Sequence, residues 1–291
     1  AMPIAQAKRL CPSGIYMRGN FAHYRAASLA VRRVLESVSP VVQMASIDEA
    51  YVDVTGSQRL FGGDDAIGEY IKRRIREETQ LPATLAITPN KLVSKIASDE
   101  AKPDGYLRIL PDEVEAFMRP LPLKKIPGIG PRTRESLERL GVYTAGALTD
   151  LPARTLIDAF GPMGHTLQRL ARGVSTTPVE PYAPPKSVSR ETTFEEDLID
   201  WKQIERIVVY LAERAAYALR EEGLETRCVT LKIRHSDFET HTFAQTLPEP
   251  TSIDSEIVEA LYALMPKARV RRAKVRLAGV HLGRLSYNQH Q

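Results

Sequence analysis

The chain has 291 residues, enough for two or three domains, and its 43% hydrophobic and 26% charged content is typical of an ordinary globular protein. Its net charge is only +4, and a sequence pI near 9.0 permits an anionic partner without requiring one. No apolar run reaches membrane-spanning length, no signal-peptide pattern is visible, and Cys11 and Cys228 have no metal-ligand spacing. These features argue against a membrane protein and predict a cytoplasmic one.

Helical and strand patterns alternate over the first 110 residues. Apolar residues at helical spacing, together with runs of β-branched residues, define the elements. Helices are predicted over residues 1–10, 20–38, 64–79 and 90–101, and strands over 40–45, 51–55, 83–87 and 106–110. This alternation predicts an α/β layer.

Two adjacent acids separate the first two predicted strands, in the stretch Ser46-Ile47-Asp48-Glu49-Ala50-Tyr51. Neighbouring side chains on a regular strand point to opposite faces, so Asp48 and Glu49 can share a site only at the bend of a hairpin. Carboxylate oxygens placed together there suit Mg²⁺. The alternative is a solvated turn in which both acids face water.

A lysine stands where the predicted helix over residues 90–101 ends, in the stretch Ala101-Lys102-Pro103-Asp104-Gly105. The helical pattern turns Leu92 and Ile96 toward the core and leaves Lys102 at the exit. One lysine alone assigns no function. Beside a metal site, however, it could contact a triphosphate as a point charge.

Residues 112–173 show short helical patterns punctuated by Pro and Gly, without a clear strand. Their strongest signal is the turn Pro127-Gly128-Ile129-Gly130, which exposes backbone N–H groups and precedes the start of a helix. Such a turn can hold one phosphate, and it resembles a helix-hairpin-helix element. The basic residues around it are Lys124, Lys125, Arg132 and Arg134. The alternative is a plain Gly-rich connection between helices.

A proline-rich stretch without periodicity predicts an extended linker over residues 174–186. The elements after it follow the order βαββαβ, which predicts a separate ferredoxin-like domain over residues 187–284. The predicted strands are 187–194, two strands around the turn at Ser236 and Asp237, and 270–282. The predicted helices are 201–222 and 252–264.

Basic residues crowd the start of the last predicted strand: Lys267, Arg269, Arg271, Arg272, Lys274 and Arg276. On a strand, Arg272, Lys274 and Arg276 share one face and leave apolar residues on the other. The earlier strand repeats this arrangement with Lys232 and Arg234 on its polar face. We therefore predict a basic stripe for nucleic acid, with a merely solvated sheet face as the alternative.

Taken in order, these motifs resemble those of the Y-family DNA polymerases, the group of bacterial DNA polymerase IV and the archaeal translesion polymerases. The central motif around Asp48 and Glu49 is specific, and the likeness runs over essentially the whole chain. The other matching stretches are Met2-Pro3-Ile4 with Ala7-Lys8, Asn90-Lys91 with Lys95-Ile96-Ala97-Ser98, Ala101-Lys102-Pro103-Asp104-Gly105, Pro127-Gly128-Ile129-Gly130, and Lys186-Ser187-Val188-Ser189-Arg190-Glu191.

The resemblance implies an α+β multidomain fold: a partial α/β palm over 1–110, an all-α thumb over 111–173, the linker, and a little finger over 187–284. It also implies template-directed DNA synthesis by nucleotidyl transfer from dNTPs, of the low-fidelity translesion type, at a site with two Mg²⁺ ions. The resemblance further implies that the protein is a monomer and that its partners are primer-template DNA and dNTP. A sliding clamp is an open further partner, although the family's carboxyl-terminal clamp peptide is not evident after Ser286.

The resemblance also implies site residues. Asp48 and Glu49 resemble the family's metal ligands, and Glu49 its catalytic acid. Lys102 resembles the residue that contacts the nucleotide triphosphate. The residues expected at the DNA backbone are Lys125, Gly128, Gly130 and Arg132 in the thumb, and Ser187, Ser189, Arg190, Lys232, Arg234, Arg272, Lys274 and Arg276 in the little finger.

The sequence departs from the family at its beginning. Intact members start with a strand that bears a further metal-ligand aspartate, and they contain a fingers domain, but neither pattern precedes Ala1. We therefore expect an incomplete fragment that binds DNA and extends primers poorly. A non-catalytic polymerase-like adaptor in a mutagenesis complex stays open, although paired acids disfavour it. A plain helix-hairpin-helix module is a third alternative, in which the α/β layer would have no purpose.

Overall fold

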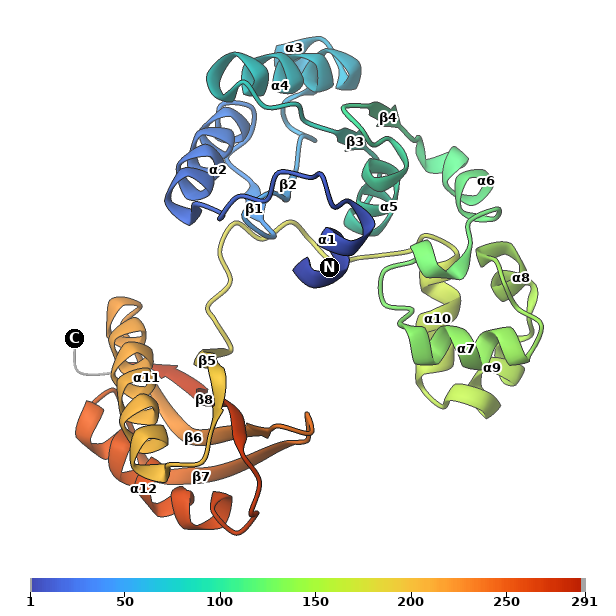
Figure 1. Ribbon diagram of the computed structural model, residues 1–291. Coiled ribbons are helices and arrows are strands. Elements are labelled where there is room, and N and C mark those ends of the chain that lie inside the picture. The colour runs from blue at the N-terminus through green and yellow to red at the C-terminus, as the bar shows by residue number, and fades with distance from the viewer. Residues whose placement is uncertain (1, 289–291) are drawn as a thin grey trace. The chain divides into compact units, whose positions relative to one another are not determined.

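The computed structural model describes residues 2–288. The chain divides into two compact units, residues 1–182 and 183–291 (Figure 1). The boundary between these units lies inside the stretch 174–186. The finer division of the first unit near residues 110 and 173 stays a prediction.

The first half of unit one consists of helices around two short pairs of strands. Its helices are α1 (Ile4–Leu10), α2 (Phe21–Glu36), α3 (Gln58–Phe61), α4 (Asp64–Thr79) and α5 (Lys91–Glu100). Its strands are β1 (Val42–Met44), β2 (Ala50–Val52), β3 (Leu85–Ile87) and β4 (Tyr106–Arg108). β1 pairs antiparallel with β2, and β3 pairs parallel with β4. The elements expected from periodicity are all present, with shorter strands.

Burial of one face of each helix holds these elements together. In α4, Ile67, Ile71 and Ile75 recur every four residues and are all buried, so they form one apolar stripe. The stripe packs against Val34 and Leu35 of α2 and against the β1–β2 hairpin. The hairpin that carries the paired acids therefore rests on a packed layer.

The second half of unit one is helical. Its elements are η1 (Pro111–Glu113), α6 (Val114–Met118), η2 (Leu123–Lys125), α7 (Pro131–Arg139), α8 (Ala145–Asp150), α9 (Ala153–Phe160) and α10 (Met163–Ala171). A core of buried leucines joins the elements from η2 to α10, including Leu123, Leu137 and Leu167. The element before the glycine turn is a short 3₁₀ helix, so the hairpin has only one full α-helix beside it, α7.

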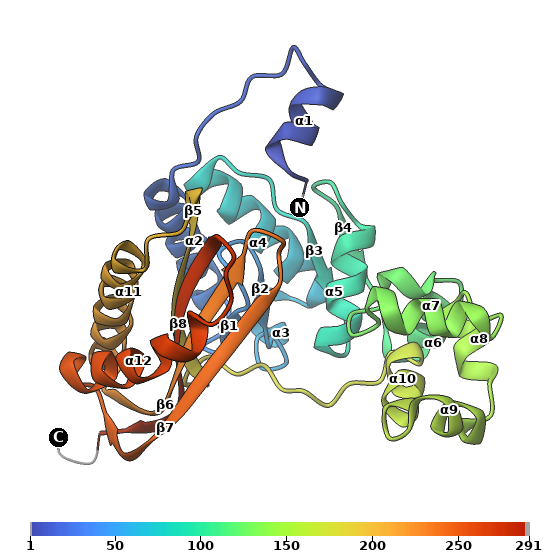
Figure 2. The same ribbon diagram turned by 60° about the horizontal axis from the view of Figure 1, so that its bottom comes forward.

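The second unit confirms the predicted βαββαβ order. Its elements are β5 (Ser187–Leu198), α11 (Trp201–Glu221), β6 (Leu224–His235), β7 (Thr240–Thr251), α12 (Asp254–Ala268) and β8 (Val275–Tyr287). The strands form one antiparallel sheet in the order β5-β8-β6-β7, so β8 lies between β5 and β6 as in a split βαβ arrangement. Both helices pack on the same face of this sheet (Figure 2).

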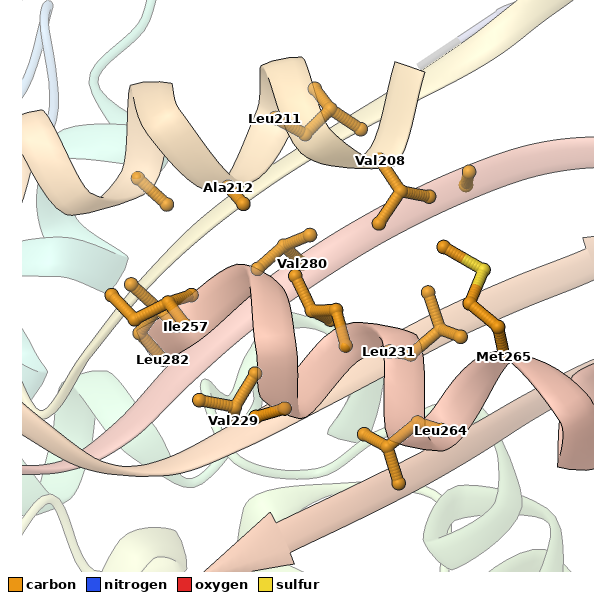
Figure 3. Close-up of a cluster of buried hydrophobic side chains, with 14 of the residues drawn as sticks. Val208, Leu211, Ala212, Val229, Leu231, Ile257, Leu264, Met265, Val280 and Leu282 are labelled. Atoms are coloured by element: carbon orange, nitrogen blue, oxygen red, sulfur yellow. The ribbon is translucent and has the colours of Figure 1, made fainter. Parts of the chain in front are cut away.

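Alternation along the strands builds the core of the second unit. Val229, Leu231 and Ile233 of β6 are fully buried at every second position, whereas the residues between them are not. Their side chains meet those of α11, α12 and β8, as Figure 3 shows for Val208 and Leu264. The opposite face of the sheet is thereby left free of helices.

The predicted start of the last strand is wrong. Buried Leu264, Met265 and Ala268 continue the helical periodicity, so α12 runs to Ala268 and the chain needs residues 269–274 to return to the sheet. Within this connection, Arg271 pairs with Asp237 and Glu239 at the β6–β7 turn. Arg272 and Lys274 therefore precede β8, which begins at Val275, and the continuous basic stripe does not form.

Two ion pairs hold the turn that follows Lys102, and we call the cluster of Lys72, Arg76 and Asp104 the lock. Lys72 of α4 donates to the backbone oxygen of Asp104 at 2.6 Å and to its Oδ1 at 2.8 Å, while Arg76 donates to Oδ2 at 2.5 Å. At Gly105 an added Cβ would lie 2.0 Å from the carbonyl oxygen of Ala101, so only glycine fits. The turn is thus fixed to α4 by side chains and to β3 by the N–H of Leu85, which donates to the carbonyl oxygen of Gly105 at 3.1 Å.

The lock predicts a pH-dependent stability difference for Asp104→Asn. The hydrogen bond from Lys72 lowers the pKa of the Asp104 carboxyl below its ordinary value. The stabilisation is therefore present above the unfolded-state pKa and is lost as the pH falls through the lower, folded-state pKa. Asparagine tolerates the left-handed backbone at this position, where φ is 50°.

Thermal unfolding should therefore give a Tm for Asp104→Asn that lies a few degrees below that of the parent at pH 7. The two Tm values should converge as the pH is lowered through the acid range. A difference that stays constant with pH would show that the carboxylate charge contributes nothing.

Candidate functional site

The paired acids lie at the bend between β1 and β2. The backbone N–H groups of Ala45 and Ser46 both donate to the carbonyl oxygen of Glu49, at 2.9 and 3.1 Å, and this closes the bend. Ser46 Oγ donates to Oδ1 of Asp48 at 2.6 Å, while Glu49 turns to another partner. Both acids are exposed, as a site open to substrate requires.

The partner of Glu49 is Lys95, in the middle of α5. Leu92, Val93, Ile96 and Ala97 bury one face of this helix, so Lys95 lies on the opposite face. Its Nζ donates to Glu49 Oε1 at 2.6 Å. The hydrogen bond to Glu49, followed by that to Asp99, outweighs burial and raises the pKa of Lys95.

The row of alternating charges continues along α5. Asp99 lies one turn after Lys95 and forms an ion pair with it, with Oδ2 3.2 Å from Nζ, and Asp99 Oδ1 accepts from Lys102 at 2.7 Å. Burial alone would raise the pKa of Asp99, but the hydrogen bonds from Lys102 and Lys95 prevail and lower it. Glu49, Lys95, Asp99 and Lys102 therefore form one alternating network from the bend to the helix exit.

Asn90 and Lys91 fix the start of α5. The Asn90 side chain accepts from the N–H of Val93 at 3.1 Å, which caps the helix, and donates to the carbonyl oxygen of Gly173 at 2.9 Å. Lys91 Nζ donates to Gln43 of β1 at 2.6 Å and to the carbonyl oxygen of Pro178 at 3.1 Å. The first part of the predicted linker is therefore held against this half of the unit.

The donor chemistry at the bend fits a hard divalent cation. Two carboxylates and a hydroxyl supply only oxygen, which is the ligand type that Mg²⁺ prefers. Among residues 2–288, no group of three or more Asp, Glu, His or Cys side chains could hold a metal ion. Asp48 and Glu49 supply carboxylate oxygens at this bend, and a cation there would need further ligands from water or substrate.

The glycine turn presents a second polar site. Ile126 and Ile129 are buried and anchor the turn, while Gly128 and Gly130 are exposed. Gly128 has φ +92°, a left-handed conformation that favours glycine. Because the first N–H groups of a helix have no partner within it, the start of α7 adds free donors at this turn.

A cleft of about 890 Å³ separates the glycine turn from the end of α5. Residues 124–130 line one side of the cleft, and Ile96, Asp99 and Glu100 line the other. Lys125 Nζ crosses it to Glu100 Oε2 at 2.6 Å. Lys125 therefore has an acidic partner, while Arg132 at the start of α7 is exposed.

The free face of the β5–β8 sheet carries part of the predicted basic set. Lys232 of β6 lies opposite Gly279 of β8, and Gly279 in turn lies opposite Glu191 of β5. Lys232 Nζ donates to Glu191 Oε2 at 2.6 Å. An added Cβ at Gly279 would lie 2.9 Å from Cβ of Glu191, so glycine allows this bridge. Arg234 donates to Thr240 on the neighbouring strand.

The other predicted residues of this surface are divided between the two faces. Pleat alternation puts Ser187 and Ser189 on the face of Glu191 but puts Arg190 on the face of Val188, which packs against the core. The regular register sets Leu277 opposite Arg234, and a register shift next to it sets Val275, rather than Arg276, opposite His235. Arg276 instead pairs with Asp197 and lies over the Phe238 ring. Arg276 therefore has an acidic partner on β5.

Sequence reasoning missed the acidic and basic partners of the site residues. Lys95, Asp99 and Lys102 are spaced by four and three residues, which is the spacing of one helix face, so their contact could have been predicted. Glu100 and Glu191 lie far in sequence from their partners, and no local pattern points to them. Within the described chain, no helix is long and apolar enough to cross a membrane.

Three family models match successive parts of the chain. The impB/mucB/samB family matches residues 1–99, the helix-hairpin-helix motif of the same family matches residues 111–142, and its C-terminal domain matches residues 185–291. Together they cover most of the sequence in one order.

Curated relatives and solved structures agree with these matches. DNA polymerase IV of Halorhodospira halophila is 38% identical over all 291 residues, which correspond to 82% of that protein. DNA polymerase IV of Desulfatibacillum aliphaticivorans is 37% identical, covering 98% of this chain and 72% of its own length.

Among solved structures, a Y-family DNA polymerase chimera of Dbh and Dpo4 has a TM-score of 0.81 and 27% identity, covering 99% of this chain and 83% of its own. An insertion ternary complex of Dbh DNA polymerase has a TM-score of 0.65 and 25% identity, covering 99% and 83%.

The cap of α5 generates a stability prediction. Asn90→Ala removes the acceptor for the Val93 N–H and should lower the free energy of unfolding by about 1 kcal/mol. Asn90→Asp keeps that acceptor and loses only the donor to Gly173, so it should be the less destabilised variant. Urea unfolding of both variants and the parent measures the difference. Equal stability of Asn90→Ala and the parent would show that the cap does not hold the helix.

Proposed function

The chain belongs to the impB/mucB/samB family of Y-family DNA polymerases, and we propose how its residues divide the work of nucleotidyl transfer. Template-directed DNA synthesis of the translesion type is the reaction of this family, and it generally requires divalent metal ions. The proposal concerns the residue roles, the number and kind of ions, and the partners.

Asp48 and Glu49 bind the metal ions in this proposal. Two Mg²⁺ ions would supply the Lewis-acid chemistry, which activates the primer 3′-hydroxyl and stabilises the leaving pyrophosphate. Asp48 provides a ligand oxygen that Ser46 already orients at 2.6 Å. Glu49, the catalytic acidic residue of this proposal, would complete the coordination from the same bend and, as a carboxylate, assist the attack of the hydroxyl.

Lys102 contacts the triphosphate of the incoming dNTP in this proposal. It stands at the exit of α5, its side chain is 58% exposed, and its Nζ is held by Asp99 at 2.7 Å. A lysine ammonium interacts with phosphate as a point charge, so an exposed and oriented ammonium suits this role. The lock at Asp104 supports the same turn.

The glycine turn and the free sheet face hold primer-template DNA in this proposal. Backbone N–H groups near Gly128 and Gly130, with Lys125 and Arg132 beside them, suit one phosphate of the duplex backbone. On the sheet, Lys232 and Arg234 provide the cations and Ser187 and Ser189 the hydroxyls. Phosphate contacts of this kind position DNA without determining its sequence.

The proposed partners of the chain are the substrates of this reaction. One structural relative is titled an insertion ternary complex of a DNA polymerase, which supports primer-template DNA and dNTP as partners of this chain. We further propose that the protein acts as a monomer in the cytoplasm. The contact that carries the whole proposal is the one between Lys95 and Glu49, because it joins the metal-binding bend to the helix that leads to Lys102.

The proposed metal ligands can be tested by single-nucleotide incorporation. Asp48→Ala and Glu49→Ala should each reduce the rate of Mg²⁺-dependent dNTP incorporation into a primer-template by at least about 100-fold, because each removes a ligand of the ions that stabilise the transition state. Asp53→Asn is the matched control, since Asp53 follows β2 on the same hairpin and its carboxylate is engaged by Thr55. Its rate should stay near that of the parent. An unchanged rate in Glu49→Ala would refute the assignment.

The DNA surface can be tested by the salt dependence of duplex binding. Each phosphate contact adds about 0.9 to the slope of log K against log salt. Replacing Lys232 and Arg234 together by alanine should therefore reduce the slope by roughly 1 to 2. Replacing Arg272 and Lys274 together removes the same charge from the connection before β8, and it should reduce the slope less. Equal reductions in both double variants would place the DNA elsewhere than on the sheet face.

A further inference from the structure

Lys95 sits between two carboxylates at unequal distances. Its Nζ lies 2.6 Å from Oε1 of Glu49, and 3.2 and 3.4 Å from the two oxygens of Asp99. The first distance is that of a tight charge-assisted hydrogen bond, while the second pair is longer than such bonds usually are. Lys95 thus has one close carboxylate partner and a second one within reach.

The close partner is a proposed metal ligand. A carboxylate oxygen that accepts from an ammonium at 2.6 Å has less capacity to coordinate a cation, since both compete for the same lone pairs. A divalent ion that binds through Oε1 of Glu49 therefore competes with Lys95 for that oxygen, and its binding is weakened while Lys95 keeps its present position.

Asp99 can accept the displaced ammonium. It lies one helical turn beyond Lys95, where side chains of a helix are neighbours. Its Oδ1 accepts from Lys102 at 2.7 Å and, at the longer distance of 3.4 Å, from Lys95, while its Oδ2 lies 3.2 Å from Lys95 Nζ. Shortening that contact requires a change in the rotamers of Lys95, and the helix backbone can stay in place.

We propose that Lys95 is a placeholder cation, which neutralises Glu49 in the metal-free protein and moves to Asp99 when a divalent ion binds. Asp99 is then a positioning residue that acts through Lys95. This inference rests on the proposed metal site at Asp48 and Glu49. It explains why two adjacent acids tolerate one another at the bend before the metal arrives.

A variant of Lys91 is the control that distinguishes this exchange from a general effect of positive charge. It lies one turn before Lys95 on the same face of α5, and it contacts Gln43 and the Tyr51 ring rather than a carboxylate. Lys91→Met removes the same charge without breaking a pair at Glu49. Lys95→Arg keeps the charge and tests whether a cation is sufficient.

The experiment is a double-mutant cycle on Mn²⁺ affinity. Proton relaxation enhancement measures the Kd of Mn²⁺ alone for the full chain, without DNA or nucleotide, in the parent, Lys95→Met, Asp99→Asn and the double variant. Lys95→Met should lower the Kd about 3- to 5-fold, because the competitor for Glu49 is removed. Lys91→Met should change it by less than about 1.5-fold, because Lys91 contacts Gln43 and Tyr51 and does not compete for Glu49, and Lys95→Arg should stay near the parent.

Asp99→Asn removes the second partner of Lys95 and should raise the Kd about 2- to 3-fold in the parent background. In the Lys95→Met background the same change should have little effect, because Asp99 acts only through Lys95. An equal factor in both backgrounds would overturn the exchange, since it would mean that Asp99 acts on the ion by long-range charge alone.

A separate variant distinguishes failure of this exchange from failure of the proposed metal site. Glu49→Gln should abolish measurable Mn²⁺ binding. If Mn²⁺ binds Glu49→Gln as it binds the parent, the metal site and the exchange both fail. If Glu49→Gln loses binding while the cycle is additive, only the exchange fails.

Discussion

The ion pair between Lys95 and Glu49 is the contact on which the arrangement of the site depends. It joins the β1–β2 bend to α5, two pieces separated by more than forty residues of sequence. The buried face of α5, from Leu92 to Ala97, fixes the helix against the core and so fixes the direction of Lys95. From there the charges alternate through Asp99 to Lys102. One rigid helix thereby orients both a proposed metal ligand and a proposed triphosphate contact, which is how a site is held to the accuracy that catalysis requires.

On both proposed nucleic-acid surfaces, a lysine is paired with an acidic residue of the same chain. Lys125 at the glycine turn pairs with Glu100, and Lys232 on the sheet pairs with Glu191, both at 2.6 Å. This pairing agrees with a net charge of only +4 in a chain whose family acts on DNA. Exposed pairs of this kind contribute little to stability, so phosphate can replace a carboxylate at low cost. DNA binding would then exchange one anionic partner for another at each cation.

Much of this fold could be predicted from the sequence because its signals are local. The helix predicted over residues 64–79 agrees with α4, and the alternation around Leu231 agrees with β6. The bend at Asp48 and Glu49 followed from acids between two strand patterns. The end of α12 was missed because the predicted helix stopped at residue 264, whereas burial of Met265 and Ala268 extends it. The partners of Lys125, Lys232 and Arg276 depend on tertiary contacts. Such features have no local sequence signal.

The central claim is that Asp48 and Glu49 hold a divalent ion in place of Lys95. The most direct measurement is a crystal structure of the full chain grown with Mn²⁺, primer-template DNA and a non-hydrolysable dNTP analogue, with anomalous diffraction recorded at the manganese edge. The account predicts an anomalous peak within coordination distance of both carboxylates, with Lys95 turned to Asp99. A peak remote from the β1–β2 bend, or Lys95 still bonded to Glu49 beside a bound ion, would contradict it.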